Sequence, residues 1–455
     1  MTNTKVKDMT TGSPMKLIIG FALPVMLGLL FQQFYNMVDT MVVGNYLGVD
    51  ALAGVGSTGA INFLILGFCL GLSTGFAVPI AQKFGAKDFP ALKKYFANTI
   101  YMTALVIIPL TIVVSVLCKP ILVLMNTSAD IIDYAYGYIF IIFLGLPIAF
   151  LYNLLSSIIR ALGDSRTPLY FLIFSALLNI ALDLVAVLAL GMGVEGPAIA
   201  TVISQGISVV LCFFYMMKKF DILRLSKKDF AFDKQKSFHL LHIGVPMGLQ
   251  FSITAIGSVL LQTAVNGISN DAVAAMSTGI KVSMFFNCPL DGLSATMATY
   301  AGQNTGAGKI DRLTKGVKSA TIIGFLYSVF AFLLLLFVSD YVALLFLKPT
   351  ETNIIDMVGQ FLFYNSLGYV FLSLIFIFRN TIQGMGYSGL SMFAGVFELV
   401  GRCSIAFAFV PTFGFIAACV ANPVSWFLAD IFLIPAFFFC KKSLVKKLEN
   451  LSQTN

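Results

Sequence analysis

The chain alternates long apolar runs with short polar segments, and this pattern predicts membrane-spanning helices. At about 1.5 Å per residue, each run as a helix is long enough to cross a hydrocarbon layer about 30 Å thick. Backbone polar groups must be paired inside hydrocarbon, so we expect every run to be helical. The twelve runs are residues 17–43, 52–80, 97–118, 131–154, 169–190, 194–217, 240–261, 278–300, 320–338, 361–378, 390–411 and 415–439.

The polar segments place basic residues on one side of this predicted bundle. Of the 29 Lys and Arg residues, only Lys119 and Lys348 fall in loops of the other side, while Lys281 and Arg402 fall in or near the runs. Loops rich in Lys and Arg are cytoplasmic, so both termini are predicted to be cytoplasmic. The net charge of +8 then reflects topology and anionic lipid headgroups, and we expect no nucleic-acid partner.

Composition agrees with a protein of the cytoplasmic membrane. Hydrophobic residues make up 58% of the chain and charged residues only 11%, which excludes a soluble fold of this length. The sequence therefore predicts an all-α, multi-pass integral membrane protein.

A repeated motif indicates that the bundle arose by duplication. The set Gly71-Leu72-Ser73, Gln82 and Gly85-Ala86 returns 221 residues later as Gly292-Leu293-Ser294, Gln303 and Gly306-Ala307. Pro24 and Pro246 also correspond. Each repeat spans six helices, an even number, so the two lobes are predicted to be related by a pseudo-two-fold axis along the membrane normal. The predicted parts are an N-terminal lobe (1–217), a basic cytoplasmic linker (218–238), a C-terminal lobe (239–440) and a basic cytoplasmic tail (441–455).

Ionisable residues inside the runs are the main candidates for function, because they are costly in hydrocarbon. They are Asp39, Asp183, Asp291, Glu398, Arg402 and Asp430. Asp183 lies four residues after Asn179, so both side chains share one helix face, and Thr201 on the next run can complete a polar cluster. The offsets used here give Asp39 and Asp183 no acidic counterpart in the second repeat.

A buried carboxyl group offers two kinds of ion coupling. Removal from water favours its neutral form, so it can take up and release a proton. With hydroxyl and amide oxygens nearby, Asp39 and Asp183 can alternatively hold Na⁺. The charged carboxylate also attracts a cationic substrate, so ion and substrate can compete. The simpler alternative is that each Asp only forms hydrogen bonds between helices.

Other polar residues have less specific interpretations. Glu398 and Arg402 lie four residues apart on one helix and are expected to form a structural ion pair. Pro24 permits a bend in the first helix. Gln33, Asn36, Asn153 and Asp291 are candidates for the wall of a substrate cavity.

Motifs for nucleotide or metal chemistry are weak. Gly384-x-Gly386-x-x-Gly389 lacks a βαβ setting, and Gly306-Ala-Gly-Lys309 lacks the first glycine and the Ser/Thr of a phosphate loop. The seven cysteines show no metal-binding spacing. We expect no cofactor, no catalytic residue and no enzyme activity.

The chain resembles the multidrug and toxic compound extrusion (MATE) transporters, in their prokaryotic DinF-like branch. The resemblance covers nearly the whole chain. The stretches that carry it are Pro24, Val38-Asp39-Thr40-Met41-Val42-Val43-Gly44, Leu47-Gly48, Ala51-Leu52-Ala53, residues 71–86, Arg160-Ala-Leu-Gly163-Asp164, Asn179-x-x-x-Asp183 and Gly193-x-x-Gly196.

The resemblance implies a cation-coupled drug antiporter that acts by alternating access. It assigns cation coupling to an acidic network of the N-terminal lobe, which maps onto Tyr35, Asp39, Asn179, Asp183 and Thr201. It further implies that the first helix bends at Pro24 when Asp39 is protonated. The sister NorM-like branch uses an acid on helix 7, but residues 246–252 contain none, which argues against that type of coupling.

Two alternatives stay open at this point. One is a flippase for lipid-linked precursors from the same superfamily, and the other is a membrane enzyme or receptor that transports nothing. On the transporter interpretation, the partners are small amphipathic, often cationic compounds and membrane lipids, and the protein acts as a monomer. The sequence does not choose between H⁺ and Na⁺.

Overall fold

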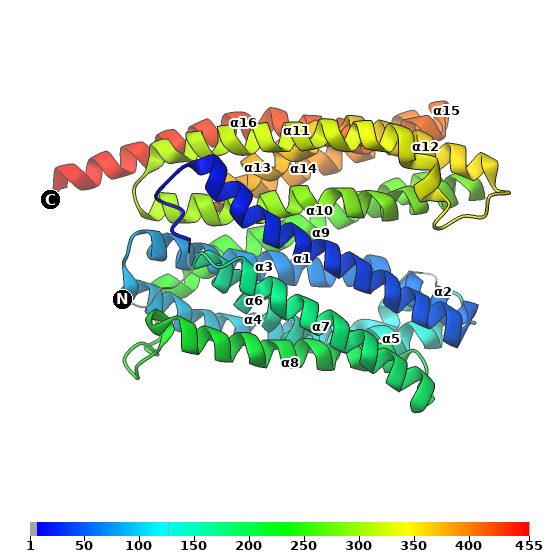
Figure 1. Ribbon diagram of the computed structural model, residues 1–455, viewed down its shortest axis with the longest axis horizontal. Coiled ribbons are helices and arrows are strands. Elements are labelled where there is room, and N and C mark those ends of the chain that lie inside the picture. The colour runs from blue at the N-terminus through cyan, green and yellow to red at the C-terminus, as the bar shows by residue number, and fades with distance from the viewer. Residues whose placement is uncertain (1–6, 126, 455) are drawn as a thin grey trace. The chain divides into compact units, whose positions relative to one another are not determined.

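The computed structural model describes residues 7–125 and 127–454, and every regular element in these residues is a helix (Figure 1). The first repeat contains α1 (Pro14–Val42), α2 (Val49–Ser57), α3 (Gly59–Gly85), α4 (Phe89–Leu124), α5 (Ile132–Leu144), α6 (Leu146–Ala161), α7 (Arg166–Leu184) and α8 (Glu195–Lys219). The second contains α9 (Lys234–Asn266), α10 (Asn270–Gly306), α11 (Ile310–Ala343), α12 (Thr352–Leu367), α13 (Tyr369–Gly384), α14 (Ser388–Ser404), α15 (Val410–Phe413) and α16 (Phe415–Thr454). Short π-helical turns are η1 (Val43–Leu47), η2 (Val185–Ala189) and η4 (Ile405–Phe409), and η3 (Asp221–Leu223) is a 3₁₀ turn.

The number of membrane passes agrees with the twelve predicted runs. Among the described residues, nine helices are long and apolar enough to span a membrane, and two bent helix pairs raise the number to eleven. The remaining pass is α10, which has 37 residues but is more polar than the others because it carries Asp271, Lys281 and Asp291. The all-α, twelve-helix fold class is confirmed.

The predicted run 52–80 falls on two helices, α2 and α3, with Thr58 between them. Two further runs, residues 131–154 and 361–378, are bent helix pairs, so the prediction of one helix is corrected for all three. The first bent pair is α5 and α6, which meet at Gly145 with a bend of 50°. Pro147 is the second residue of α6, and proline has no N–H to continue the hydrogen bonds of α5. The second bent pair is α12 and α13, which meet at Gly368 with a bend of 46°.

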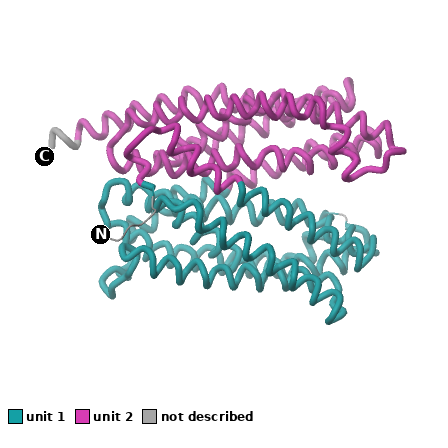
Figure 2. Tube along the Cα trace, viewed as in Figure 1, with its two compact units in different colours: residues 1–7, 27–248 teal, residues 8–26, 249–455 magenta. Residues whose placement is uncertain are grey.

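The chain forms two compact units, which Figure 2 shows in teal and magenta. Within the described residues, unit 1 contains Lys7 and residues 27–248, and unit 2 contains residues 8–26 and 249–454. Both boundaries therefore fall inside helices, α1 and α9, two residues after Pro24 and Pro246 respectively. The lobe boundaries predicted from the sequence repeat describe the duplication and stay a prediction.

The repeated Gly-Leu-Ser motif marks close backbone packing inside each unit. In unit 1, a Cβ atom on Gly71 would lie 2.3 Å from the carbonyl oxygen of Met247 on α9. In unit 2, a Cβ atom on Gly292 would lie 2.9 Å from the backbone nitrogen of Met26 on α1. Only glycine allows two helix backbones to approach this closely. The motif is doubled because the same contact is made twice.

The loops that follow these helices also share one backbone conformation. Lys87 has φ of 58° and Gly308, 221 residues later, has φ of 69°. The left-handed conformation is unusual for a residue with a Cβ atom, so its recurrence supports the duplication at the level of backbone geometry.

Asp88 begins α4 and provides a testable local stabilisation. Its Oδ1 accepts a hydrogen bond from the backbone N–H of Ala91, and its Oδ2 pairs with Lys83 at 3.0 Å. The hydrogen bond from Lys83 holds the pKa of this carboxyl below its usual value. We expect Asp88→Ala to lower the free energy of unfolding by about 1 kcal/mol. Because the pKa is lowered in the folded state, this contribution is present at neutral pH and is lost as pH falls through that pKa.

Thermal unfolding of the detergent-solubilised protein across a pH series measures this effect. A wild-type advantage over Asp88→Ala that is the same at acidic and neutral pH would contradict the assignment of the cap to the charged carboxylate.

Candidate functional site

Helices α1, α7 and α8 bring the predicted acidic residues and their polar neighbours together inside unit 1. Asp39 lies near the end of α1, Asn179 and Asp183 lie one turn apart on α7, and Thr201 lies on α8. The carboxyl groups of Asp39 and Asp183 are hydrogen-bonding partners. Two acids that are 144 positions apart in sequence thus form one site.

Asn179 connects this acid pair to α8. In the orientation that gives both amide atoms suitable partners, its Nδ2 donates to Asp39 Oδ1 at 3.0 Å, and its oxygen accepts from the backbone N–H of Thr201 at 3.2 Å and from the Thr201 hydroxyl at 3.3 Å. Asn179 therefore bridges Asp39 on α1 and Thr201 on α8.

The burial of this pair affects whether its carboxyl groups carry a proton. Asp183 is fully buried, Asn179 is 2% exposed, and Asp39 is partly exposed. Among the described residues, no N–H or hydroxyl group donates to the buried Asp183 Oδ2. Two carboxyl groups in contact repel each other when both are ionised, so a hydrogen bond between them requires a shared proton. The pair can therefore store at least one proton.

Two tyrosines lie near the acid pair, and a third lies near one of them. Tyr35, one turn before Asp39 on α1, and Tyr138 on α5 both lie close enough to interact electrostatically with both carboxyl groups. Tyr152 on α6 interacts with Tyr35. Sequence reasoning did not find Tyr138 or Tyr152. Their only signal was a hydroxyl group within an otherwise apolar run.

A π-helical turn follows each of the two acids. The η1 turn starts four residues after Asp39 and the η2 turn starts two residues after Asp183. Such turns widen the helix by one residue and are frequent at functional sites.

The predicted cavity residues lie in both units. In unit 1, Asn36 Nδ2 donates to Gln33 Oε1 at 3.3 Å, and Asn153 Nδ2 donates to the carbonyl of Ala149 at 2.9 Å. Asp291 lies on α10 in unit 2 and is exposed. Whether these residues share one cavity stays a prediction. Pro24 lies inside the continuous helix α1, and bending at this residue likewise stays a prediction.

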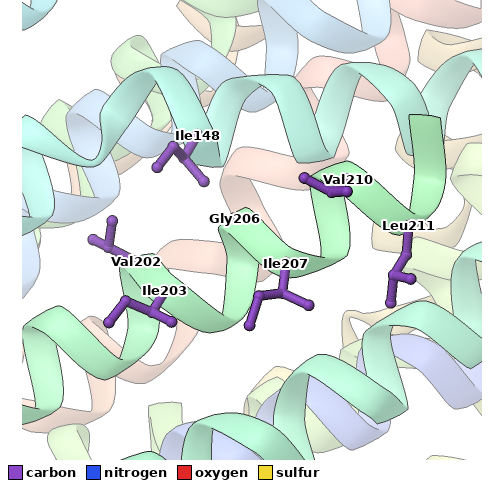
Figure 3. Close-up of a pocket in the computed structure, with 7 residues that line it drawn as sticks. All are labelled: Ile148, Val202, Ile203, Gly206, Ile207, Val210 and Leu211. Atoms are coloured by element: carbon purple, nitrogen blue, oxygen red, sulfur yellow. The ribbon is translucent and has the colours of Figure 1, made fainter. Parts of the chain in front are cut away.

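A pocket of about 360 Å³ lies on another part of unit 1, between α6 and α8 (Figure 3). Its lining is entirely apolar, and most of it comes from one face of α8. The lining residues are Ile148, Val202, Ile203, Gly206, Ile207, Val210 and Leu211. An apolar groove on a membrane helix matches a lipid acyl chain, and it offers no polar group to orient a solute. We therefore do not assign this pocket to the acid pair.

The predicted ion pair of α14 is confirmed, with an additional partner. Arg402 Nη2 lies 3.4 Å from Glu398 Oε2, and Arg379 on α13 pairs with the other carboxylate oxygen of Glu398. Sequence reasoning missed Arg379 because its apolar run was taken to end at residue 378.

Comparisons of the sequence and of the fold with known proteins all match the same kind of protein. The family model described as MatE matches residues 24–185 and 246–410, one segment in each repeat. The "Probable multidrug resistance protein YoeA" of Bacillus subtilis (strain 168) is 31% identical over 73% of each chain. The "FAD transporter" of Shewanella oneidensis is 21% identical over 81% of this chain and 82% of its own length. A crystal structure of MATE in complex with MaL6 superposes with a TM-score of 0.91 at 22% identity, covering 98% of this chain and all of the other.

Proposed function

Because the chain belongs to the MatE family of multidrug efflux transporters, we propose that it is a secondary antiporter that exports amphipathic, often cationic compounds in exchange for protons. The observation that carries this proposal is the pairing of the carboxyl groups of the buried Asp183 and the partly exposed Asp39. Transport needs no group that makes or breaks covalent bonds, and the family consists of transporters, so the protein is not an enzyme.

The acid pair supplies the coupling in this proposal. When the pair holds its proton, it is neutral and has little attraction for a cation. When the proton leaves, the pair carries a full negative charge in a low-dielectric site, and a cationic substrate is attracted. Proton and substrate then exclude each other at the site, which is the requirement for antiport.

Asn179 and Thr201 support the change of protonation. The amide of Asn179 donates to Asp39, so it can stabilise the carboxylate that forms there when the proton leaves. Tyr35 and Tyr138 provide further hydroxyl groups near the carboxyl groups. The N-terminal site can therefore change its charge without a charged partner of opposite sign.

The direct contact between the two carboxyl groups favours H⁺ over Na⁺. A Na⁺ ion at this site would need several oxygen ligands arranged around it, with the carboxylates on either side of the ion. A proton needs only the hydrogen bond between the two oxygens. Na⁺ coupling is the alternative that the experiment below separates.

We further propose that the protein resides in the cytoplasmic membrane, with both termini on the cytoplasmic side, and that the monomer is sufficient for transport. The support is the placement of the basic residues in the loops and the presence of a complete acid site within a single chain.

Substrate flux in proteoliposomes tests the proposal, with pH and Na⁺ gradients imposed separately. We expect a cationic dye to move against an imposed proton gradient and to ignore a Na⁺ gradient. The "FAD transporter" relative makes an anionic dinucleotide a useful second solute. Flux that responds only to the Na⁺ gradient would identify Na⁺ as the coupling ion in place of H⁺. If neither gradient drove flux of any solute, the proposal of an antiporter would be contradicted.

A further inference from the structure

Unit 2 contains a buried cluster of four charged residues that the proposed transport mechanism does not use. Arg379 lies on α13, Glu398 and Arg402 lie on α14, and Asp430 lies on α16. These four residues are between 3% and 5% exposed. A buried charge destabilises the protein unless it is paired, so a charged residue without a partner in this cluster needs an explanation.

The guanidinium group of Arg402 forms hydrogen bonds both inside the cluster and with residues next to it. Its Nη2 faces Glu398, its Nε donates to Asn422 Oδ1 at 3.0 Å, and its Nη1 donates to the carbonyl of Thr254 at 3.4 Å. Glu398 is held on both oxygens, by Arg402 on one and by Arg379 on the other. These three residues form a closed network with one positive charge in excess.

Asp430 lies beside this network but is not bonded to it. Both of its carboxyl oxygens are buried, and no described residue forms a hydrogen bond with either. Arg379 Nε is likewise buried without a partner among the described residues. Arg379 and Glu398 interact electrostatically with Asp430. The cluster therefore holds one acceptor group and one donor that form no hydrogen bond in this structure.

The other helices packed against α16 bring no further charge to this point. The η4 and α15 segments, residues 405–413, contain no ionisable side chain. On α12, Asp356 is exposed near the start of the helix, and Asn365 contributes only its amide. On α11, the charged residues lie in the first three turns and in the last turn, and the hydroxyl group of Tyr327 donates to the carbonyl of Phe286.

We propose that Asp430 is a second proton-binding site, in the C-terminal repeat, and that its proton decides the partner of Arg379. In the structure Arg379 pairs with Glu398 and leaves Asp430 unbonded, which is the arrangement of a neutral, protonated Asp430. When the proton leaves, the carboxylate accepts a hydrogen bond from Arg379 Nε, and the guanidinium bridges α14 and α16. The four charges of the cluster then sum to zero.

The chemistry of the cluster selects a proton over other ligands. A metal cation would meet two arginine side chains and a single free carboxylate, which is too few oxygen ligands for Na⁺ or a divalent ion. A solute has no access to oxygens that are fully buried. A proton needs neither space nor further ligands.

The chain carries a natural reporter of this site. Trp426 is its single tryptophan, and it lies on α16 one turn before Asp430, so both side chains share one helix face. Its ring packs against Tyr369 of α13, with ring centroids 6.4 Å apart. A shift of Arg379 on α13 towards α16 changes the surroundings of this indole ring. Tryptophan fluorescence therefore reads the α13–α16 contact directly.

The test is a pH titration of tryptophan fluorescence of the purified full-length protein, excited where tyrosine does not absorb. We expect a single reversible transition in the wild type and its loss in Asp430→Asn, which keeps the shape but cannot ionise. Asp39→Asn, in unit 1, is the matched control and should keep the transition. Size-exclusion chromatography establishes that each variant is folded.

A second variant keeps the test decisive if Asp430→Asn does not fold. Glu398→Gln removes the competing partner of Arg379 and a negative charge near Asp430. Both changes favour the Asp430 carboxylate, so the midpoint of the transition should move to lower pH by about one unit. An unchanged transition in folded Asp430→Asn, an unchanged midpoint in Glu398→Gln, or a wild-type signal that does not vary with pH would overturn the proposal.

Discussion

Replacement of Asp39 or Asp183 by Asn is expected to reduce gradient-driven efflux to the level of vesicles without protein. Asn matches the shape of Asp and keeps a hydrogen bond across the pair, but it can neither bind nor release the shared proton. Substrate–substrate exchange without a gradient should persist, because that process needs no change of protonation. The measurement is paired: uphill flux under an imposed pH gradient, and exchange of labelled for unlabelled substrate.

Asp340→Asn is the matched control for this prediction. Asp340 lies exposed near the end of α11, outside the acid site, and the substitution removes the same charge. We expect both activities to be near wild type. If folded Asp39→Asn and Asp183→Asn proteins both retained full uphill flux, the acid pair would not be the coupling site.

Gly71→Val is expected to cause a large loss of stability, because it places a side chain between the backbones of α3 and α9. The added Cβ would lie 2.3 Å from the carbonyl oxygen of Met247 and 2.7 Å from the Cα atom of Gly248, both part of the α9 backbone. A helix backbone cannot turn aside as a side chain can, so α3 and α9 must separate. We expect a loss of about 3 kcal/mol, measured as a fall in the thermal unfolding midpoint of the detergent-solubilised protein.

Gly59→Val on the same helix is the control for this substitution. A Cβ atom on Gly59 would meet no atom within 4 Å. The unfolding midpoint should then stay close to wild type, since replacing glycine in a helix is intrinsically neutral or favourable. Equal losses in the two variants would attribute the effect to valine in α3 and not to the contact with α9.

The helices and part of the site were predictable because they depend on local spacing. Apolar runs gave the twelve passes, and the four-residue interval between Asn179 and Asp183 placed both side chains on one face of α7. The meeting of Asp39 with Asp183 depends on tertiary packing of α1 against α7. No spacing within the sequence contains it, and only the family resemblance suggested it.

The features that sequence reasoning missed have physical reasons. Arg379 lies at the end of an apolar run, where a basic residue usually faces headgroups, yet its side chain turns inward to Glu398. The bends at Gly145 and Gly368 leave the hydropathy of each run unchanged, so an apolar pattern alone does not reveal them. The unit boundaries inside α1 and α9 depend on contacts between distant helices, which the repeat offset does not record.

Those boundaries mean that neither repeat is a complete folding unit. Residues 8–26 belong to unit 2 although they begin the first repeat, and residues 234–248 belong to unit 1 although they begin the second. A gene fragment that ends in the linker would therefore encode six helices with an exposed glycine face on α3, and the other fragment would leave the equivalent face on α10 uncovered. The duplication that produced this chain also made its two copies dependent on each other, so selection acts on them as one molecule.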